Sequence, residues 1–93
     1  MPKYYVYILR SLSRHSLYIG SSGNPDVRLN AHNTGKVIST KSFRPWVRIW
    51  LEELDTKANA LKREKYLKSG WGRKWINKNV KSKIYFSAIK IVN

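Results

Sequence analysis

Short runs of apolar and aromatic residues, separated by polar turns, dominate the first half of the chain. Residues 4–9 and 17–21 are rich in β-branched and aromatic side chains, which is typical of strands. The polar segment between them, residues 10–16, is short enough for a hairpin. A third run, residues 46–51, follows Pro45, and proline is tolerated at the entry of a strand. The pattern therefore predicts three strands.

A helix is predicted between the second and third strands. Asn24 is a favoured capping residue, and Pro25 suits the first helical position. Gly35 is typical of the residue just past a helix end. Residues 36–44 then form a basic loop that leads into the third strand.

The second half of the chain is predicted to be helical. Asp55 or Thr56 caps a second helix that runs to about Ser69, with Gly70 closing it. Residues 71–78 predict a short third helix. The order β-β-α-β-α-α predicts an α+β fold, with a three-stranded antiparallel sheet flanked by helices.

The length of 93 residues is that of one domain. We expect residues 1–80 to form the functional domain and residues 81–93 to form a C-terminal tail packed on the same domain. Alternation of side chains over residues 84–89 gives a weaker indication of a late strand.

The charge changes this picture of a plain α+β domain. Nineteen Lys and Arg against five acids give a net charge of +14, which favours a polyanionic partner, nucleic acid first. No segment has the apolar and basic faces of an interfacial helix, so a membrane partner ranks well behind, as does a merely solubilising surface. The absence of cysteine excludes disulfides and thiolate metal sites. With no membrane-length apolar run and no signal peptide, a cytoplasmic protein is expected.

One acid stands out on the second predicted helix. Ala60, Leu61, Glu64, Leu67 and Trp71 follow the spacing of one helix face, which places a carboxylate within an apolar stripe. A buried carboxylate is costly unless it is paired or binds a cation. The position predicts either a cation ligand or a structural salt bridge.

Four further side chains could join this carboxylate in one site. Arg28 and His32 share a helix face; the first suits a phosphate oxygen, and the second could hydrogen-bond a phosphate or move a proton. Tyr7 and Tyr18 lie on the first two strands, where tyrosines are usually core residues. They share a face only if paired residue numbers have an odd sum. One common site further requires that both face Glu64.

These segments resemble the GIY-YIG nuclease family over roughly residues 3–78, and the similarity is greatest to its small, stand-alone bacterial members. The matching motifs are Tyr5-Val6-Tyr7-Ile8, Tyr18-Ile19-Gly20, Arg28-x-x-x-His32 and Leu61-Lys62-Arg63-Glu64.

The resemblance implies phosphodiester hydrolysis with one divalent metal, Mg or Mn. It implies that Glu64 holds the metal and that Arg28 stabilises charge on the phosphate. By the same resemblance, Tyr7 and Tyr18 match the two motif tyrosines, one of which activates the water. His32 matches a motif histidine, and Gly20 matches a glycine that leaves room for the site.

The chain departs from the family at several positions. Ser21 stands where some relatives carry a lysine, so the missing cation is expected from Lys36 or Lys41. Asn77 is a loose match to an asparagine that follows the glutamate in several relatives. The basic loop, including Arg44, is expected to contact the nucleic-acid backbone.

We therefore predict a metal-dependent endonuclease of the DNA-repair type, structure-directed or weakly sequence-specific, acting on DNA rather than RNA. The first alternative is a nucleic-acid-binding module on the same fold with little or no cleavage. The second is a basic accessory protein of a ribonucleoprotein, for which the motifs would be accidental.

Overall fold

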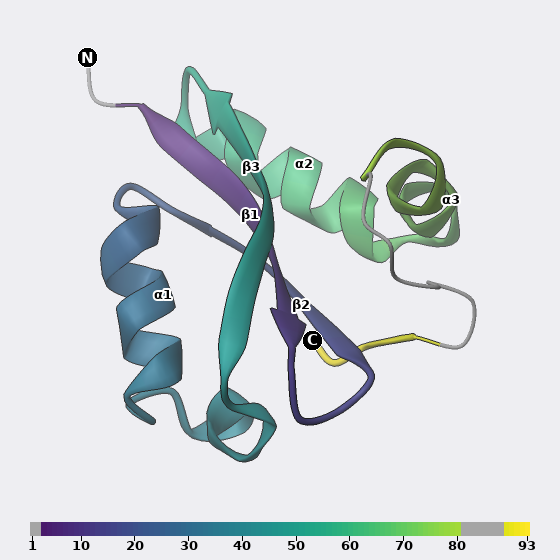
Figure 1. Cartoon of the computed structure of the whole chain (residues 1–93). Helices are drawn as coiled ribbons and strands as arrows, with labels where there is room; N and C mark the ends of the chain where they lie inside the picture. The colour runs from purple at the N-terminus through teal and green to yellow at the C-terminus, as the bar shows by residue number, and fades with distance from the viewer. Residues whose placement is uncertain (1–2, 81–88) are drawn as a thin grey trace.

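The computed structural model describes residues 3–80 and 89–93, and its elements form a mixed sheet with helices on both faces (Figure 1). The strand order is β3-β1-β2-β4. The elements are β1 (Tyr4–Ser11), β2 (Ser16–Ser22), α1 (Pro25–Asn33), a 3-10 helix η1 (Ile38–Phe43), β3 (Trp46–Leu54), α2 (Lys57–Lys68), α3 (Gly70–Asn79) and β4 (Lys90–Ile91). The predicted α+β class and the predicted element order are confirmed, with η1 added inside the segment expected to be a loop.

The register between β1 and β2 puts the two motif tyrosines on one face. Tyr7 lies opposite Gly20, and Leu9 lies opposite Tyr18, in an antiparallel pairing. In both pairs the two residue numbers have an odd sum, which is the condition for Tyr7 and Tyr18 to share a face. The prediction of a common face for Tyr7 and Tyr18 is confirmed.

The sheet has a fourth strand that the sequence pattern did not predict. β4 pairs in parallel with β2 at Ser16 and Leu17. The side chain of Asn93 extends this edge by accepting from the backbone N–H of Ile19 and donating to its carbonyl. The sequence predicted a purely antiparallel sheet of three strands, and the structure adds the short parallel strand β4. Apart from Ile89, which is buried, the late strand expected over residues 84–89 lies outside the described residues.

Each face of the sheet has its own apolar cluster. On one face, Val6 and Ile8 of β1 pack with Ala60 and Leu67 of α2, and α3 completes this layer. On the other face, Tyr7 and its neighbours pack under α1 and η1. Figure 1 shows α1 on one side of the sheet and α2 and α3 on the other. None of the helices in the described stretches is long and apolar enough to cross a membrane.

Local capping chemistry sets most helix ends as expected. The Asn24 side chain accepts from the N–H of Val27, and Thr56 caps α2 in the same way. Gly35 has φ +79°, the left-handed conformation that glycine adopts most easily after a helix. Gly70 does not close α2 but is the first residue of α3, because Ser69 ends one helix and caps the next.

Candidate active site

Tyr7 reaches across the neighbouring strand at the motif glycine. A Cβ atom placed on Gly20 would lie 2.6 Å from the Tyr7 hydroxyl oxygen and 3.0 Å from the Tyr18 ring. The Tyr7 ring itself is buried and packs 6.4 Å from the Tyr18 ring, centroid to centroid. Gly20 therefore leaves the space through which the Tyr7 hydroxyl approaches the outer edge of β2.

Arg28 of α1 is the cation that acts on the pKa of the Tyr7 hydroxyl. Burial raises the pKa of Tyr7, and a side-chain hydrogen bond and charge from Arg28 oppose that rise. The two effects have opposite signs because burial disfavours the phenolate, whereas a guanidinium favours it. The pKa of Tyr7 remains raised overall, so the phenol is protonated near pH 7 with the Arg28 guanidinium acting on its hydroxyl.

His32 of α1 lies beside both tyrosines. Its ring centroid is 4.6 Å from that of Tyr18 and 6.3 Å from that of Tyr7, and its side chain is fully buried. Burial, with a further contribution from the charge of Arg28, lowers the pKa of His32 to about 4. The imidazole is therefore neutral near pH 7.

Thr40 lies where it can set which nitrogen of His32 carries the proton. When the Thr40 hydroxyl donates to the carbonyl of Val37, at 3.3 Å, its oxygen accepts from Nδ1–H of His32 at 2.8 Å. Nε2 is then the bare acceptor. It is buried and has no hydrogen-bond partner within the described part of the chain. A buried acceptor of this kind, beside two tyrosines, can receive a proton or a hydrogen bond from a bound molecule.

Glu64 of α2 is held by two polar partners. Ser21 Oγ donates to Glu64 Oε1 at 2.7 Å, and Lys68 Nζ donates to Oε2 at 2.8 Å. The Glu64 side chain is 20% exposed, so the carboxylate is accessible from solvent. The sequence left two interpretations of this acid, and the salt bridge is present. The carboxylate is only partly exposed, so a cation would share it with Ser21 and Lys68.

The apolar stripe expected around Glu64 is only partly correct. Ala60 and Leu67 are buried, but Leu61 is 49% exposed and Trp71 is 72% exposed. The reason is that α2 ends at Lys68, so Trp71 belongs to a separate helix and does not continue the spacing.

The expectation that the tyrosines face Glu64 is wrong, because α2 covers the opposite face of the sheet. Tyr7 and Tyr18 pack toward α1 and η1, whereas Ser21, which holds Glu64, follows Gly20 and points to the other face. The two halves of the site meet at the edge of β2. Pairing with β4 and Asn93 covers β2 only as far as Ile19 in the described ranges. The Glu64 charge still acts on Tyr7 and raises its pKa.

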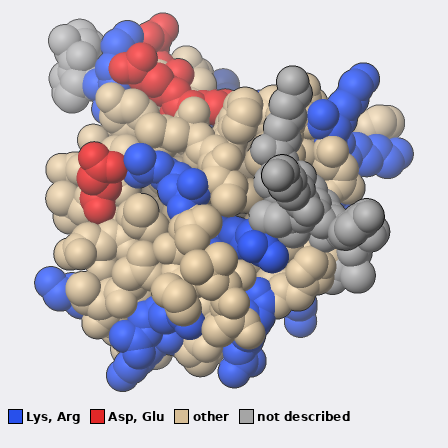
Figure 2. All heavy atoms as spheres, viewed as in Figure 1, with Lys and Arg blue, Asp and Glu red and all other residues tan. Residues whose placement is uncertain are grey.

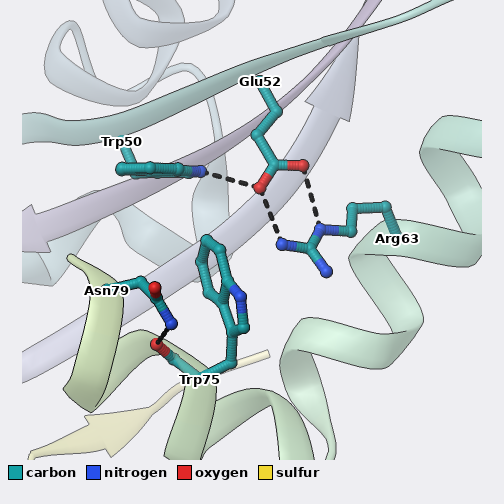
Figure 3. Close-up of polar contacts among 5 residues, drawn as sticks. All are labelled: Trp50, Glu52, Arg63, Trp75 and Asn79. Atoms are coloured by element: carbon teal, nitrogen blue, oxygen red, sulfur yellow. Dashed lines mark hydrogen bonds and ion pairs between the residues drawn. The ribbon is translucent and has the colours of Figure 1, made fainter.

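Arg63, next to Glu64, anchors α2 to the sheet (Figure 3). It makes two hydrogen bonds to Glu52 of β3, at 2.8 and 2.9 Å, and Trp50 Nε1 donates to the same carboxylate at 2.9 Å. The guanidinium also lies over the ring of Trp75, 4.4 Å from its centroid. A bidentate pair stacked on an aromatic ring restricts the orientation of α2, and so the position of Glu64.

The four residues predicted to contact nucleic acid are all exposed, on two different parts of the surface. Lys36 follows α1, Lys41 lies in η1, and Arg44 follows η1 and donates from Nε to the Lys41 carbonyl. Asn77 lies on α3. The cation that contacts Glu64 is instead Lys68, which the motif comparison missed. Its i, i+4 spacing from Glu64 was the signal that could have identified it.

The polar groups around Glu64 are the Ser21 hydroxyl and the Lys68 ammonium, both bonded to the one carboxylate. In residues 3–80 and 89–93, no three His, Cys, Asp or Glu side chains come together as a metal-binding group. A site of several His or Cys ligands, as zinc requires, does not fit this arrangement. Magnesium is commonly held through one or two carboxylates, several waters and substrate phosphate oxygens, which a single exposed carboxylate can support.

The sequence matches the model of the GIY-YIG catalytic domain over residues 3–84. "UPF0213 protein SH2523" of Staphylococcus haemolyticus is 39% identical over 70 residues, which are 74% of this chain and 84% of that protein. A UPF0213 protein of Syntrophus aciditrophicus is 44% identical over 70 residues, 73% of this chain and 79% of that protein. "Structure-specific endonuclease subunit SLX1" of Podospora anserina is 55% identical over 49 residues, 46% of this chain and 14% of that protein.

The chain belongs to the GIY-YIG family. Its matches to the two UPF0213 proteins cover most of their length, so these bacterial relatives consist of little beyond this domain. The predicted family and the predicted similarity to its small bacterial members are confirmed.

Proposed function

We propose that this protein is a divalent-metal-dependent endonuclease that hydrolyses phosphodiester bonds, with DNA of branched or flapped structure as the favoured substrate. The observation that carries the proposal is the meeting of two groups at consecutive residues of β2. Gly20 admits the Tyr7 hydroxyl from one face of the sheet, and Ser21 holds Glu64 from the other. A phosphate seated at this edge would be within reach of both groups.

Each side chain has a role that its surroundings support. Glu64 would hold the ion, together with waters and phosphate oxygens. Magnesium or manganese, when bound, would polarise the phosphate and assist the leaving oxygen. Arg28 would stabilise the charge that develops on the phosphate. Tyr7 is our candidate for the group that takes the proton of the attacking water; burial raises its pKa, and Arg28 together with the ion, when bound, would act to lower it.

His32 would assist on the proton-accepting side. With a pKa of about 4, the imidazole stays neutral near pH 7, and a bare Nε2 would accept a hydrogen bond from the bound substrate or water rather than hold a proton. Tyr18, whose ring is tilted against that of His32, would keep water out of this part of the site.

The surface charge supports a nucleic-acid substrate. On the face shown in Figure 2, acidic side chains lie in the upper left, whereas the charged side chains coloured in its lower half are all Lys or Arg. Such a distribution attracts a phosphate backbone without reading its sequence. The SLX1 relatives, described as structure-specific endonuclease subunits, motivate the choice of branched and flapped DNA.

A cleavage panel tests the proposal. Labelled flapped, branched, duplex and single-stranded DNA, and RNA of matched length, are incubated with the protein in Mg²⁺, in Mn²⁺ and in EDTA. We expect cleavage of branched or flapped DNA in either metal and none in EDTA, with Arg28→Ala at least about 100-fold slower. Binding without cleavage of any substrate would instead support a non-catalytic nucleic-acid-binding module.

A further inference from the structure

Trp71 differs from the other three tryptophans of the chain. Trp46 is buried, and Trp50 and Trp75 pack against the core and against each other, with ring centroids 5.4 Å apart. Trp71 is 72% exposed in the first turn of α3. An exposed tryptophan forgoes the free energy of burying its large apolar ring. The Trp71 side chain is therefore available to contact a partner.

The surroundings of Trp71 are strongly basic. Residues 57–79, which span α2 and α3, carry eight Lys and Arg and a single acid, Glu64. Lys74 lies over the indole, with Nζ 4.9 Å from the ring centroid. Three more cations of these helices, Lys62, Lys65 and Lys78, are exposed. In Figure 2, Lys and Arg side chains project at the upper right, where Figure 1 places α3.

The backbone holds Trp71 at a fixed place relative to Glu64. A Cβ atom on Gly72 would collide with the carbonyl oxygen of Tyr66 and with the backbone of Leu67. The first turn of α3 is therefore in direct contact with the last turn of α2. An aromatic platform fixed on the helix pair that carries Glu64 loses little freedom when a ligand stacks on it.

We propose that Trp71 and Lys74 form a base-stacking site that holds an unpaired stretch of nucleic acid beside the cleavage site. Every base presents a π-face, so stacking on an exposed indole accepts any sequence, while nearby lysines bind the phosphates. The identity of the ligand as nucleic acid rests on the proposed function. The site adds a preference for single-stranded segments, which the residues around Glu64 and Tyr7 do not explain.

A membrane surface is the competing partner for an exposed tryptophan among lysines. Binding to a bilayer requires an apolar helix face of several residues. On α3, however, Gly72 and Ile76 are already buried against the protein, and Trp75 packs on the core. A single exposed indole fits one stacked base better than insertion into lipid.

Binding measured in EDTA tests the site without any cleavage. Fluorescence anisotropy would follow a labelled 12-nucleotide oligothymidylate and a 12-base-pair duplex with wild type, Trp71→Ala and Trp71→Phe. Leu12→Ala is the matched control, because Leu12 is 54% exposed between β1 and β2, outside both the basic loop and the α2–α3 pair. We expect Trp71→Ala to weaken single-strand binding roughly 5- to 100-fold, with a smaller loss for the duplex, an intermediate loss for Trp71→Phe and none for Leu12→Ala.

Tryptophan emission gives a second readout. Oligothymidylate should quench the wild-type emission, and Trp71→Phe should lose most of that quenching. Equal single-strand affinity for Trp71→Ala and wild type, or unchanged quenching in Trp71→Phe, would overturn the proposal. So would a Trp71→Ala protein that loses binding to anionic vesicles but not to the oligonucleotide. Because these experiments contain no metal, a failure of catalysis leaves their outcome unaffected.

Discussion

The hydroxyl of Tyr7 lies directly over Gly20, in the space that any larger residue would fill. The distance from the hydroxyl oxygen to a Cβ placed on Gly20 is 2.6 Å, closer than real Cβ contacts come. The ring of Tyr7 is buried and cannot simply swing into solvent. The motif glycine is therefore required for space, and the position of the candidate proton acceptor depends on it.

Gly20→Ala should displace Tyr7 and reduce both stability and cleavage. Overpacking of this kind costs about 1–3 kcal/mol, which urea denaturation can measure. Gly70→Ala is the matched control, because a Cβ at Gly70 meets nothing within 4 Å. A Gly20→Ala protein that is as stable and as active as wild type would show that Tyr7 does not need this space.

Thr40 should set the tautomer of His32. In wild type, ¹⁵N NMR of the imidazole is expected to show the proton on Nδ1 and a bare Nε2, as the hydrogen bonds indicate. Thr40→Val keeps the shape but removes the hydroxyl, so the tautomers should mix and cleavage should slow about tenfold or more. Thr40→Ser keeps the hydroxyl and should retain both properties. A proton found on Nε2 in wild type would contradict this assignment.

The buried His32 should make stability depend on pH. Its pKa is about 4 in the folded protein against 6.5 for the unperturbed side chain. Between these values the unfolded state binds more protons, so the free energy of unfolding should fall as the pH is lowered from 6.5 to 4. The His32 contribution is up to about 3 kcal/mol and is complete above pH 6.5.

Urea denaturation of wild type and His32→Asn across this pH range isolates the His32 contribution. The variant should be less stable at pH 7 but should show the shallower pH dependence, because the group whose pKa burial lowers has been removed. Parallel curves for the two proteins would mean that His32 has a nearly unperturbed pKa.

Local patterns in the sequence predicted the half of the site that depends on short-range geometry. The common face of Tyr7 and Tyr18 follows from strand parity, and the first turn of α1 follows from Asn24 and Pro25. These features are decided by residues close in the chain, so the sequence carries them directly.

Long-range packing decided what the sequence could not predict. That α2 covers the face opposite the tyrosines depends on how the chain crosses the sheet, and helical spacing says nothing about it. Thr40 was missed because it lies in η1, a turn of helix inside a segment that reads as a basic loop. β4 was missed because a two-residue strand carries no periodic pattern.

The ion pair between Lys68 and Glu64 belongs to the candidate active site, although by its spacing it resembles an ordinary surface pair. At i, i+4 from Glu64, Lys68 makes a common helix salt bridge. Only the hydrogen bond from Ser21 to the same carboxylate shows that this pair lies against the edge of β2 rather than in open solvent.

The role of Glu64 in cleavage is tested most directly by Glu64→Gln measured beside Glu53→Gln. Glutamine keeps the size of Glu64 and can still accept from Ser21, but it lacks the charge that would hold the ion. Glu53 is exposed on β3, where its carboxylate accepts a 3.5 Å hydrogen bond from Tyr5, so its variant controls for the loss of one charge. Single-turnover cleavage of flapped DNA in Mg²⁺ should fall at least about 100-fold for Glu64→Gln, with binding in EDTA retained, and should be unchanged for Glu53→Gln. Cleavage by Glu64→Gln at the wild-type rate would contradict the account.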